Sequence, residues 1–204
     1  MSSFDARART WDENPIHMNR SLAIAEKMEE CIPLKSLRSA LEYGAGTGNL
    51  SFLFKDSIAH ITTMDNSSEM VKVMLEKLDK MQISNVHPLQ CDLEKEEYSE
   101  QTFDLIFMQM VLHHVMQIKP FLEKCFHLLN VGGSIAIADL YTEDGSFHGA
   151  GFDGHLGFDI EELSKTLLSI GYSKIEHEQC YDMLKTNESG QTKSYPIFLL
   201  RASK

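Results

Sequence analysis

A short glycine-rich run gives the first indication of ligand chemistry. Gly44, Gly46 and Gly48 follow a predicted strand and precede a predicted helix, so the backbone can turn tightly and let a ligand approach the main chain. The start of that helix offers free N–H groups and a partial positive charge. Asp65 ends the next predicted strand, where its carboxylate can accept hydrogen bonds from both hydroxyls of a ribose. These residues together predict a site for a ligand that contains a nucleoside.

Two departures from the dinucleotide-binding pattern narrow the kind of ligand. In that pattern, G-x-G-x-x-G, the third glycine falls where Asn49 stands. Glu42 lies two residues before the first glycine, and a carboxylate there would repel a pyrophosphate but attract an ammonium group. The residues therefore favour a nucleoside that bears an amino acid over NAD.

Polar residues also follow the third and fourth predicted strands. Asp92 comes after the third strand, where its carboxylate can accept a hydrogen bond from an adenine amino group. The run M-Q-M-V-L-H-H, residues 108–114, comes after the fourth strand. An imidazole titrates near neutrality, so His113 or His114 is a candidate general base. The alternative is that both histidines are ordinary hydrogen-bonded loop residues.

Strand and helix patterns alternate along the chain and place these residues at one edge of a sheet. Five strand–helix units predict a doubly wound α/β sheet with right-handed crossovers, which binds ligands beyond the carboxyl ends of its strands. Two further apolar runs, joined by the polar loop TNESGQTK, predict a terminal antiparallel hairpin. The expected strands are 39–43, 61–64, 86–91, 103–108, 134–138, 174–184 and 195–202, and the expected helices are 14–32, 48–56, 67–81, 120–131 and 159–171.

The motifs and their order resemble those of the class I S-adenosylmethionine-dependent methyltransferases, in particular the small type 11/12-like members. The resemblance covers roughly residues 35–202 and implies a seven-stranded, Rossmann-like methyltransferase sheet with a reversed terminal hairpin strand. It also implies S-adenosylmethionine as the cofactor and S-adenosylhomocysteine as the product. The segments that carry it are E-Y-G-A-G-T-G-N at 42–49, Asp65, Asp92, F-D-L-I-F-M-Q-M-V-L-H-H-V at 103–115 and L-N-V-G-G-S-I-A-I-A-D at 129–139.

The resemblance implies a cofactor-binding role for eight positions of this sequence. The residues expected at the cofactor are Glu42, Gly44 and Gly46 at its methionine part, Asp65 and Asn66 at its ribose, Asp92 and the Leu93 backbone at its adenine, and the Met108 carbonyl near its amino group. The family often has a small residue where Met108 stands, but a backbone contact survives that change.

The segment 140–158 is expected to form a lid over the substrate. It follows the fifth strand and is rich in glycine and phenylalanine, which suits a mobile loop with an apolar inner face. Phe152 and His155 are its candidate pocket residues. His148, Asp153 and His155 match no known ligand spacing, so no metal site is predicted.

The first part of the chain is expected to cover the cofactor. Trp11 is the only tryptophan, and its ring could shield a sulfonium or, equally, anchor a helix. We therefore divide the chain into a lid and helix region, residues 1–34, and a cofactor-binding methyltransferase domain, residues 35–204, within one domain overall.

Composition limits the partners. The chain has 204 residues with 19 Lys and Arg and 30 Asp and Glu, a net charge of −11, which disfavours nucleic acid and an anionic membrane surface as partners. No apolar run reaches the length of a membrane-spanning helix, and the first residues lack the pattern of a secretory signal. Four scattered cysteines suit reduced thiols, so a cytoplasmic location is expected.

The sequence leaves three functions to weigh. The first is a methyltransferase that acts on a small molecule, because the chain has the family's core without a large inserted domain. The second is a cofactor-binding accessory module without turnover, which the intact glycines and acids disfavour. The third is an NAD-dependent oxidoreductase, which Glu42 and Asn49 disfavour.

Overall fold

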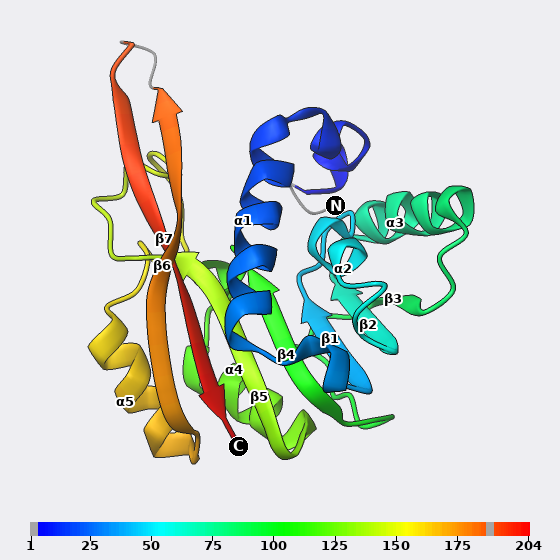
Figure 1. Cartoon of the computed structure of the whole chain (residues 1–204). Coiled ribbons are helices and arrows are strands. Elements are labelled where there is room, and N and C mark those ends of the chain that lie inside the picture. The colour runs from blue at the N-terminus through cyan, green and yellow to red at the C-terminus, as the bar shows by residue number, and fades with distance from the viewer. Residues whose placement is uncertain (1–3, 187–189) are drawn as a thin grey trace.

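A single seven-stranded sheet organises the molecule. The computed structural model describes residues 4–186 and 190–204. The strand order is β3-β2-β1-β4-β5-β7-β6, and β7 runs antiparallel to both of its neighbours (Figure 1). This arrangement confirms the predicted doubly wound sheet with a reversed terminal hairpin strand. The strands are β1 Ser39–Tyr43, β2 His60–Asp65, β3 Val86–Gln90, β4 Phe103–Gln109, β5 Leu129–Leu140, β6 Ser173–Thr186 and β7 Thr192–Ser203.

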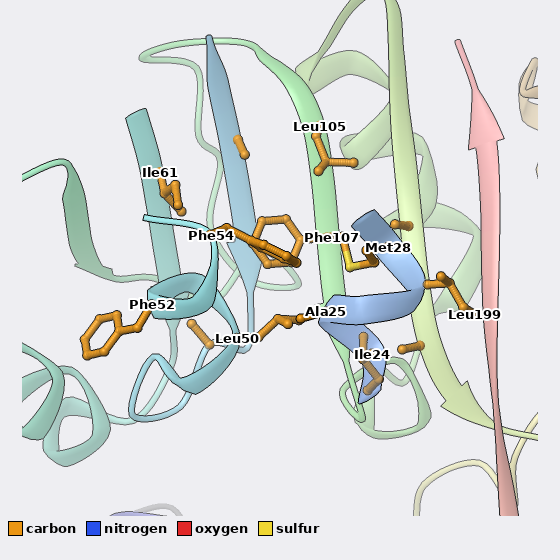
Figure 2. Packing of buried hydrophobic residues seen from close by; sticks show 14 of the residues in the cluster. Ile24, Ala25, Met28, Leu50, Phe52, Phe54, Ile61, Leu105, Phe107 and Leu199 are labelled. Carbon is orange, nitrogen blue, oxygen red and sulfur yellow. The ribbon is translucent and has the colours of Figure 1, made fainter. Parts of the chain in front are cut away.

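Helices cover both faces of the sheet. The helical segments are η1 Asp5–Glu13, α1 Pro15–Cys31, η2 Leu34–Ser36, α2 Asn49–Leu53, α3 Ser68–Met81, η3 Leu112–His114, α4 Ile118–Leu128 and α5 Ile160–Ile170. Side chains of α1, α2 and α3 pack on one face and those of α4 and α5 on the other. Figure 2 shows the first face, where Ile24 and Met28 of α1 and Leu50 of α2 lie over Phe107 of β4. Two separate apolar cores therefore hold the central strands in place.

Three predicted helix starts agree with the structure. The Asn14 side chain accepts a hydrogen bond from the Ile16 N–H at 3.1 Å, and Ser67 accepts one from the Met70 N–H at 3.2 Å. Asp159 caps α5 by accepting from the N–H groups of residues 161 and 162. Each cap satisfies backbone donors that a helix leaves unpaired in its first turn.

Several boundaries differ from the prediction. Helix α4 begins at Ile118 rather than Pro120, because a proline costs no hydrogen bond inside a first turn. The polar segment before Asn14, where no element is predicted, forms the 3₁₀ helix η1. The hairpin strands are longer than expected, and part of the loop between them, residues 187–189, lies outside the described residues.

The carboxyl ends of the parallel strands meet at one edge of the sheet. The loops after β1, β2, β4 and β5 all leave from this edge, and the N-terminal segment lies over it (Figure 1). The chemistry-bearing residues named from the sequence therefore come from neighbouring loops.

Among residues 4–186 and 190–204, none of the helices is both long and apolar enough to cross a membrane.

Candidate functional site

A cavity of about 410 Å³ lies at this edge of the sheet. Its walls come from η1, α1, the loops after β1, β2, β3, β4 and β5, and the end of β6. The lining residues that matter most for chemistry are Arg20, Gly46, Asp65, Glu94, His113 and His148. The cavity thus joins the glycine-rich loop to the histidines that follow β4.

The glycine-rich loop is tied directly to the acid at the end of β2. The Gly46 N–H donates to Oδ2 of Asp65 at 2.8 Å, and the Ser67 N–H donates to Oδ1 at 2.8 Å. Burial raises the pKa of Asp65, and these two N–H groups oppose that rise. Since a carboxylate offers about four lone-pair positions, Asp65 can still accept two further hydrogen bonds from a ligand.

Two glycines of the loop have different roles. Gly44 and Gly46 both have positive φ angles, 67° and 56°. A Cβ on Gly44 would lie 2.3 Å from Cγ2 of Val111, so Gly44 is needed for packing. A Cβ on Gly46 would meet nothing nearer than Nε1 of Trp11, at 4.0 Å. Gly46 therefore faces open space in the cavity, where a side chain would occupy room available to a ligand.

Glu42 lies beneath the loop rather than in the cavity wall. Its Oε2 accepts hydrogen bonds from the Ser51 N–H at 3.0 Å and from the Ser51 hydroxyl. Its Oε1 is buried and has no hydrogen-bond partner among the described residues. Burial raises the pKa of Glu42 to about 8, and the Ser51 contacts oppose the rise. The unpartnered oxygen leaves Glu42 able to accept one more hydrogen bond.

The acids after β3 are arranged differently from the prediction. Asn66 lines the cavity as expected, but Asp92 and Leu93 do not. The Asp92 carboxylate instead pairs with Nζ of Lys95 at 2.7 Å and caps its own turn. Glu94 reaches the cavity in their place, and its Oε1 accepts from the backbone N–H groups that follow η3.

At the end of β4, the residues that line the cavity lie further along the chain than expected. Met108 is buried outside the lining, and Gln109, Met110 and Val111 line the cavity instead. Met110 has a φ of 54°, and its N–H donates to the Ala138 carbonyl at 2.7 Å. This left-handed residue turns the chain out of the strand, which is why the contact falls beyond Met108.

The two predicted catalytic histidines come together with a third. His113 is buried, and its Nδ1–H donates to Oδ1 of Asp139 at 2.6 Å. Asp139 also accepts from the backbone N–H groups of His113 and Leu140. The ring centroid of His113 lies 4.2 Å from that of His114 and 4.8 Å from that of His148. Asp139 therefore fixes the orientation of His113 and leaves its Nε2 for the cavity.

The other two histidines are neutral at physiological pH. The pKa of His114 is lowered to about 4, first by burial and then by the neighbouring His113 and His148. The pKa of His148 is also lowered to about 4, again mainly by burial. Neutral imidazoles keep a lone pair that can accept a proton or bind a metal.

The loop 140–158 closes one side of the cavity. Phe147 and His148 line it, and the His148 ring stacks on Phe152 with centroids 3.8 Å apart. His155 is not among the lining residues and fastens the loop: its backbone N–H donates to the His113 carbonyl at 2.8 Å. Of the loop's two candidate pocket residues, Phe152 therefore supports a lining residue and His155 anchors the loop.

The helix η1 covers the glycine-rich loop from above. The Asp12 carboxylate accepts from the Thr47 hydroxyl at 2.6 Å, from the Asn49 amide at 2.9 Å and from Nζ of Lys77 at 2.7 Å. Trp11 lines the cavity and stacks on His17, with ring centroids 4.0 Å apart. One partly exposed network of polar contacts thus joins the N-terminal segment to the loop and to α3.

Arg20 is a site residue that the sequence analysis missed. It lies on the inner face of α1, lines the cavity and is only 8% exposed. Its Nε is buried and has no hydrogen-bond partner among the described residues. Burial lowers its pKa to about 10, with Asp139 opposing, so it stays charged at neutral pH. An arginine in helical register with the buried Ile24 was the available sequence signal.

Comparison with known proteins identifies similar chains. Residues 34–195 match the family model described as a methyltransferase domain. An uncharacterized methyltransferase of Schizosaccharomyces pombe, C1347.09, is 30% identical over 122 residues, which are 56% of this chain and 43% of that one. The chain spans about half the length of the first curated relatives that it matches.

Solved structures share the fold. The YcgJ protein of Bacillus subtilis superposes with a TM-score of 0.75 at 16% identity, over 88% of this chain and 97% of that one. The phosphoethanolamine N-methyltransferase 2 of Haemonchus contortus, solved with phosphomonomethylethanolamine and S-adenosylhomocysteine, gives a TM-score of 0.73 at 18% identity, over 91% of this chain and 52% of that one. At these identities the likeness concerns the fold.

Proposed function

This chain belongs to the class I S-adenosylmethionine-dependent methyltransferase family, and from that premise we propose that it methylates a small-molecule acceptor. One observation carries the proposal: a single cavity of about 410 Å³ runs from the glycine-rich loop to the histidines after β4. A volume of this order suits a small ligand site rather than a macromolecular surface. The Haemonchus contortus structure, solved with the small molecule phosphomonomethylethanolamine and S-adenosylhomocysteine, supports the same class of substrate.

The residues around the loop fit an S-adenosylmethionine-type cofactor. Gly46 leaves open space, Asp65 keeps two acceptor positions for ribose hydroxyls, and Asn66 lies beside it. The unpartnered Oε1 of Glu42 leaves one hydrogen-bonding position of its carboxyl group open behind the loop. Glu94 is the acid that reaches the cavity where an adenine contact was expected from Asp92. When bound, the cofactor supplies an electrophilic methyl group on a sulfonium.

The chain's own residues would align the acceptor and exclude water. Helix η1 and the loop 140–158 cover the cavity, and an in-line displacement depends on such alignment and desolvation. His113, oriented by Asp139, keeps Nε2 free to accept a proton from an acceptor hydroxyl, thiol or ammonium group. His114 lines the same wall and remains the second candidate catalytic residue.

Arg20 would bind an anionic group at the far end of the cavity. A buried guanidinium with an unpaired N–H is stabilised by a carboxylate or phosphate. Two sources share that chemistry: the carboxylate of the cofactor's amino-acid part and an anionic group of the acceptor.

Four free cysteines, Cys31, Cys91, Cys125 and Cys180, support the further proposal of a reducing, cytoplasmic location.

Calorimetric titration with S-adenosylhomocysteine, with NAD as the control, tests the proposal. Micromolar binding of S-adenosylhomocysteine alone is expected, followed by release of S-adenosylhomocysteine from S-adenosylmethionine in a screen of small acceptors. Binding of NAD alone would make the chain an oxidoreductase. Cofactor binding without turnover on any acceptor class would identify an accessory module instead.

A further inference from the structure

Three imidazoles of the cavity form a compact cluster that the sequence spacing did not predict. Each of His113, His114 and His148 offers one ring nitrogen, and these three nitrogens lie within 4.8 Å of one another. Two of the residues follow β4, and the third comes from the loop after β5. The fold therefore brings together a set that no sequence motif contains.

The available nitrogens suit a metal ion. Nδ1 of His113 is held by Asp139, which leaves Nε2 as its ligand atom. Within residues 4–186 and 190–204, no hydrogen bond to a ring nitrogen of His114 or His148 is formed. Ring stacking on Phe152 positions His148 without using either of its nitrogens.

A buried carboxylate behind a histidine is a second, independent feature of metal sites. In such sites the ligating imidazole donates its other ring N–H to a carboxylate, which sets the tautomer and raises the basicity of the ligand nitrogen. Asp139 stands in this relation to His113 at 2.6 Å, and both side chains are almost fully buried. A carboxylate in this place is unnecessary for a histidine that only fills space.

We propose that His113, His114 and His148 bind a divalent transition-metal ion such as Zn²⁺ inside the cavity. Three imidazoles and an open fourth position are the ligand set of catalytic zinc sites. Imidazole donors suit zinc and its neighbours in the first transition row, whereas Mg²⁺ and Ca²⁺ prefer oxygen ligands. The fourth position would face the cavity, since all three histidines line it.

The metal site would also narrow the chemical class of the acceptor, an inference that rests on the proposed methyltransferase function. An acceptor hydroxyl or thiol bound at the fourth position loses its proton to water more readily, because the cation stabilises the anion. The oxygen or sulfur lone pair then forms the bond to the methyl carbon while the carbon–sulfonium bond breaks, and S-adenosylhomocysteine leaves. In this arrangement His113 and His114 act as ligands rather than as bases, and the acceptor is an alcohol, phenol or thiol.

Metal binding by the full chain tests the site directly. Protein freed of metal with a chelator would be titrated with Zn²⁺ by calorimetry, and Co²⁺ would report the ligands through its visible spectrum. We expect one ion per chain with imidazole ligands, and at least about tenfold weaker binding in His114→Ala and His148→Ala. His127→Ala, an exposed histidine on α4, is the matched control and should bind as the wild type does.

Other outcomes would overturn the proposal. Equal Zn²⁺ affinity in wild type, His114→Ala and His148→Ala would place the ion elsewhere, and a thiolate-to-Co²⁺ charge-transfer band would assign it to cysteines. His148 lies in an exposed loop, so its variant tests the site even if a change at buried His113 prevents folding. S-adenosylhomocysteine titration of the same samples separates the two proposals. Absence of Zn²⁺ binding by a wild type that still binds S-adenosylhomocysteine overturns the metal site alone, and absence of S-adenosylhomocysteine binding by the wild type overturns the methyltransferase.

Discussion

The two halves of the cavity are built in different ways. Around the glycine-rich loop, Gly46, Asp65 and Ser67 come from the ends of two strands that are consecutive in the chain, and backbone N–H groups hold the carboxylate. Around the histidines, Arg20, His113 and His148 come from three separate elements. The first half is therefore set by short local segments and the second only by the complete fold.

Under the proposed function, this difference would separate recognition of the cofactor from recognition of the acceptor. A turn between one strand and one helix can keep its geometry while distant segments change. A wall assembled from α1, the loop after β4 and the loop 140–158 can be altered by a change in any one of them. The following predictions test whether the two halves behave independently.

The largest effect is expected on stability, from the acid beneath the glycine-rich loop. Glu42 has a normal pKa of 4.5 when unfolded and one of about 8 in the fold. Below pH 4.5 both states are protonated, whereas between pH 4.5 and 8 only the unfolded chain has lost the proton. The free energy of unfolding then falls as pH rises, by roughly 5 kcal/mol in total. Glu42→Gln should remove this loss.

Denaturant unfolding at a series of pH values measures the effect. The difference between Glu42→Gln and the wild type should grow from pH 5 to pH 8 and then level off. Glu29→Gln, on the exposed face of α1, is the control and should follow the wild type. A difference that does not change with pH would mean that Glu42 is ionised in the fold.

The next largest effect is expected on cofactor affinity. Gly46→Val would place a side chain in the open space of the cavity and should weaken S-adenosylhomocysteine binding about 100-fold, a loss of roughly 3 kcal/mol. Gly132→Val is the matched control, since Gly132 also has a positive φ and open surroundings but lies far from the cavity. Gly46→Val and Gly132→Val should unfold at similarly lowered temperatures. Equal S-adenosylhomocysteine affinity in the two variants would refute the placement of the ligand beside Gly46.

Arg20→Met probes the boundary between the halves. Methionine fills similar space without a buried charge, so stability should be unchanged or higher, while affinity for the bound anion should fall about tenfold. Calorimetry with S-adenosylhomocysteine and with methylthioadenosine, which lacks the amino-acid carboxylate, distinguishes the sources. Weakening of the former alone assigns Arg20 to the cofactor. Unchanged affinity for both assigns it to the acceptor, and weakening of both would contradict a carboxylate contact.

Features determined by local segments could be predicted from the sequence, whereas features determined by the complete fold could not. The sheet, its reversed strand and the caps at Asn14 and Ser67 could be predicted because local patterns determine them. The cluster of His148 with His113 could not, because the segments that carry these residues meet only through the strand order. Arg20 was missed for the same reason, since helical spacing shows which face is buried but not which cavity that face borders.

The smallest expected effect concerns two neighbouring acids that the sequence could not tell apart. Glu94 lines the cavity, whereas Asp92 pairs with Lys95 outside it. Glu94→Ala should weaken S-adenosylhomocysteine binding about five- to tenfold, since one hydrogen bond to a charged group contributes roughly 1 to 2 kcal/mol. Asp92→Ala should change it less than about twofold, because Asp92 does not line the cavity and its carboxylate is paired with Lys95. The reverse order would return the adenine contact to Asp92 and would require the turn after β3 to rearrange when the cofactor binds.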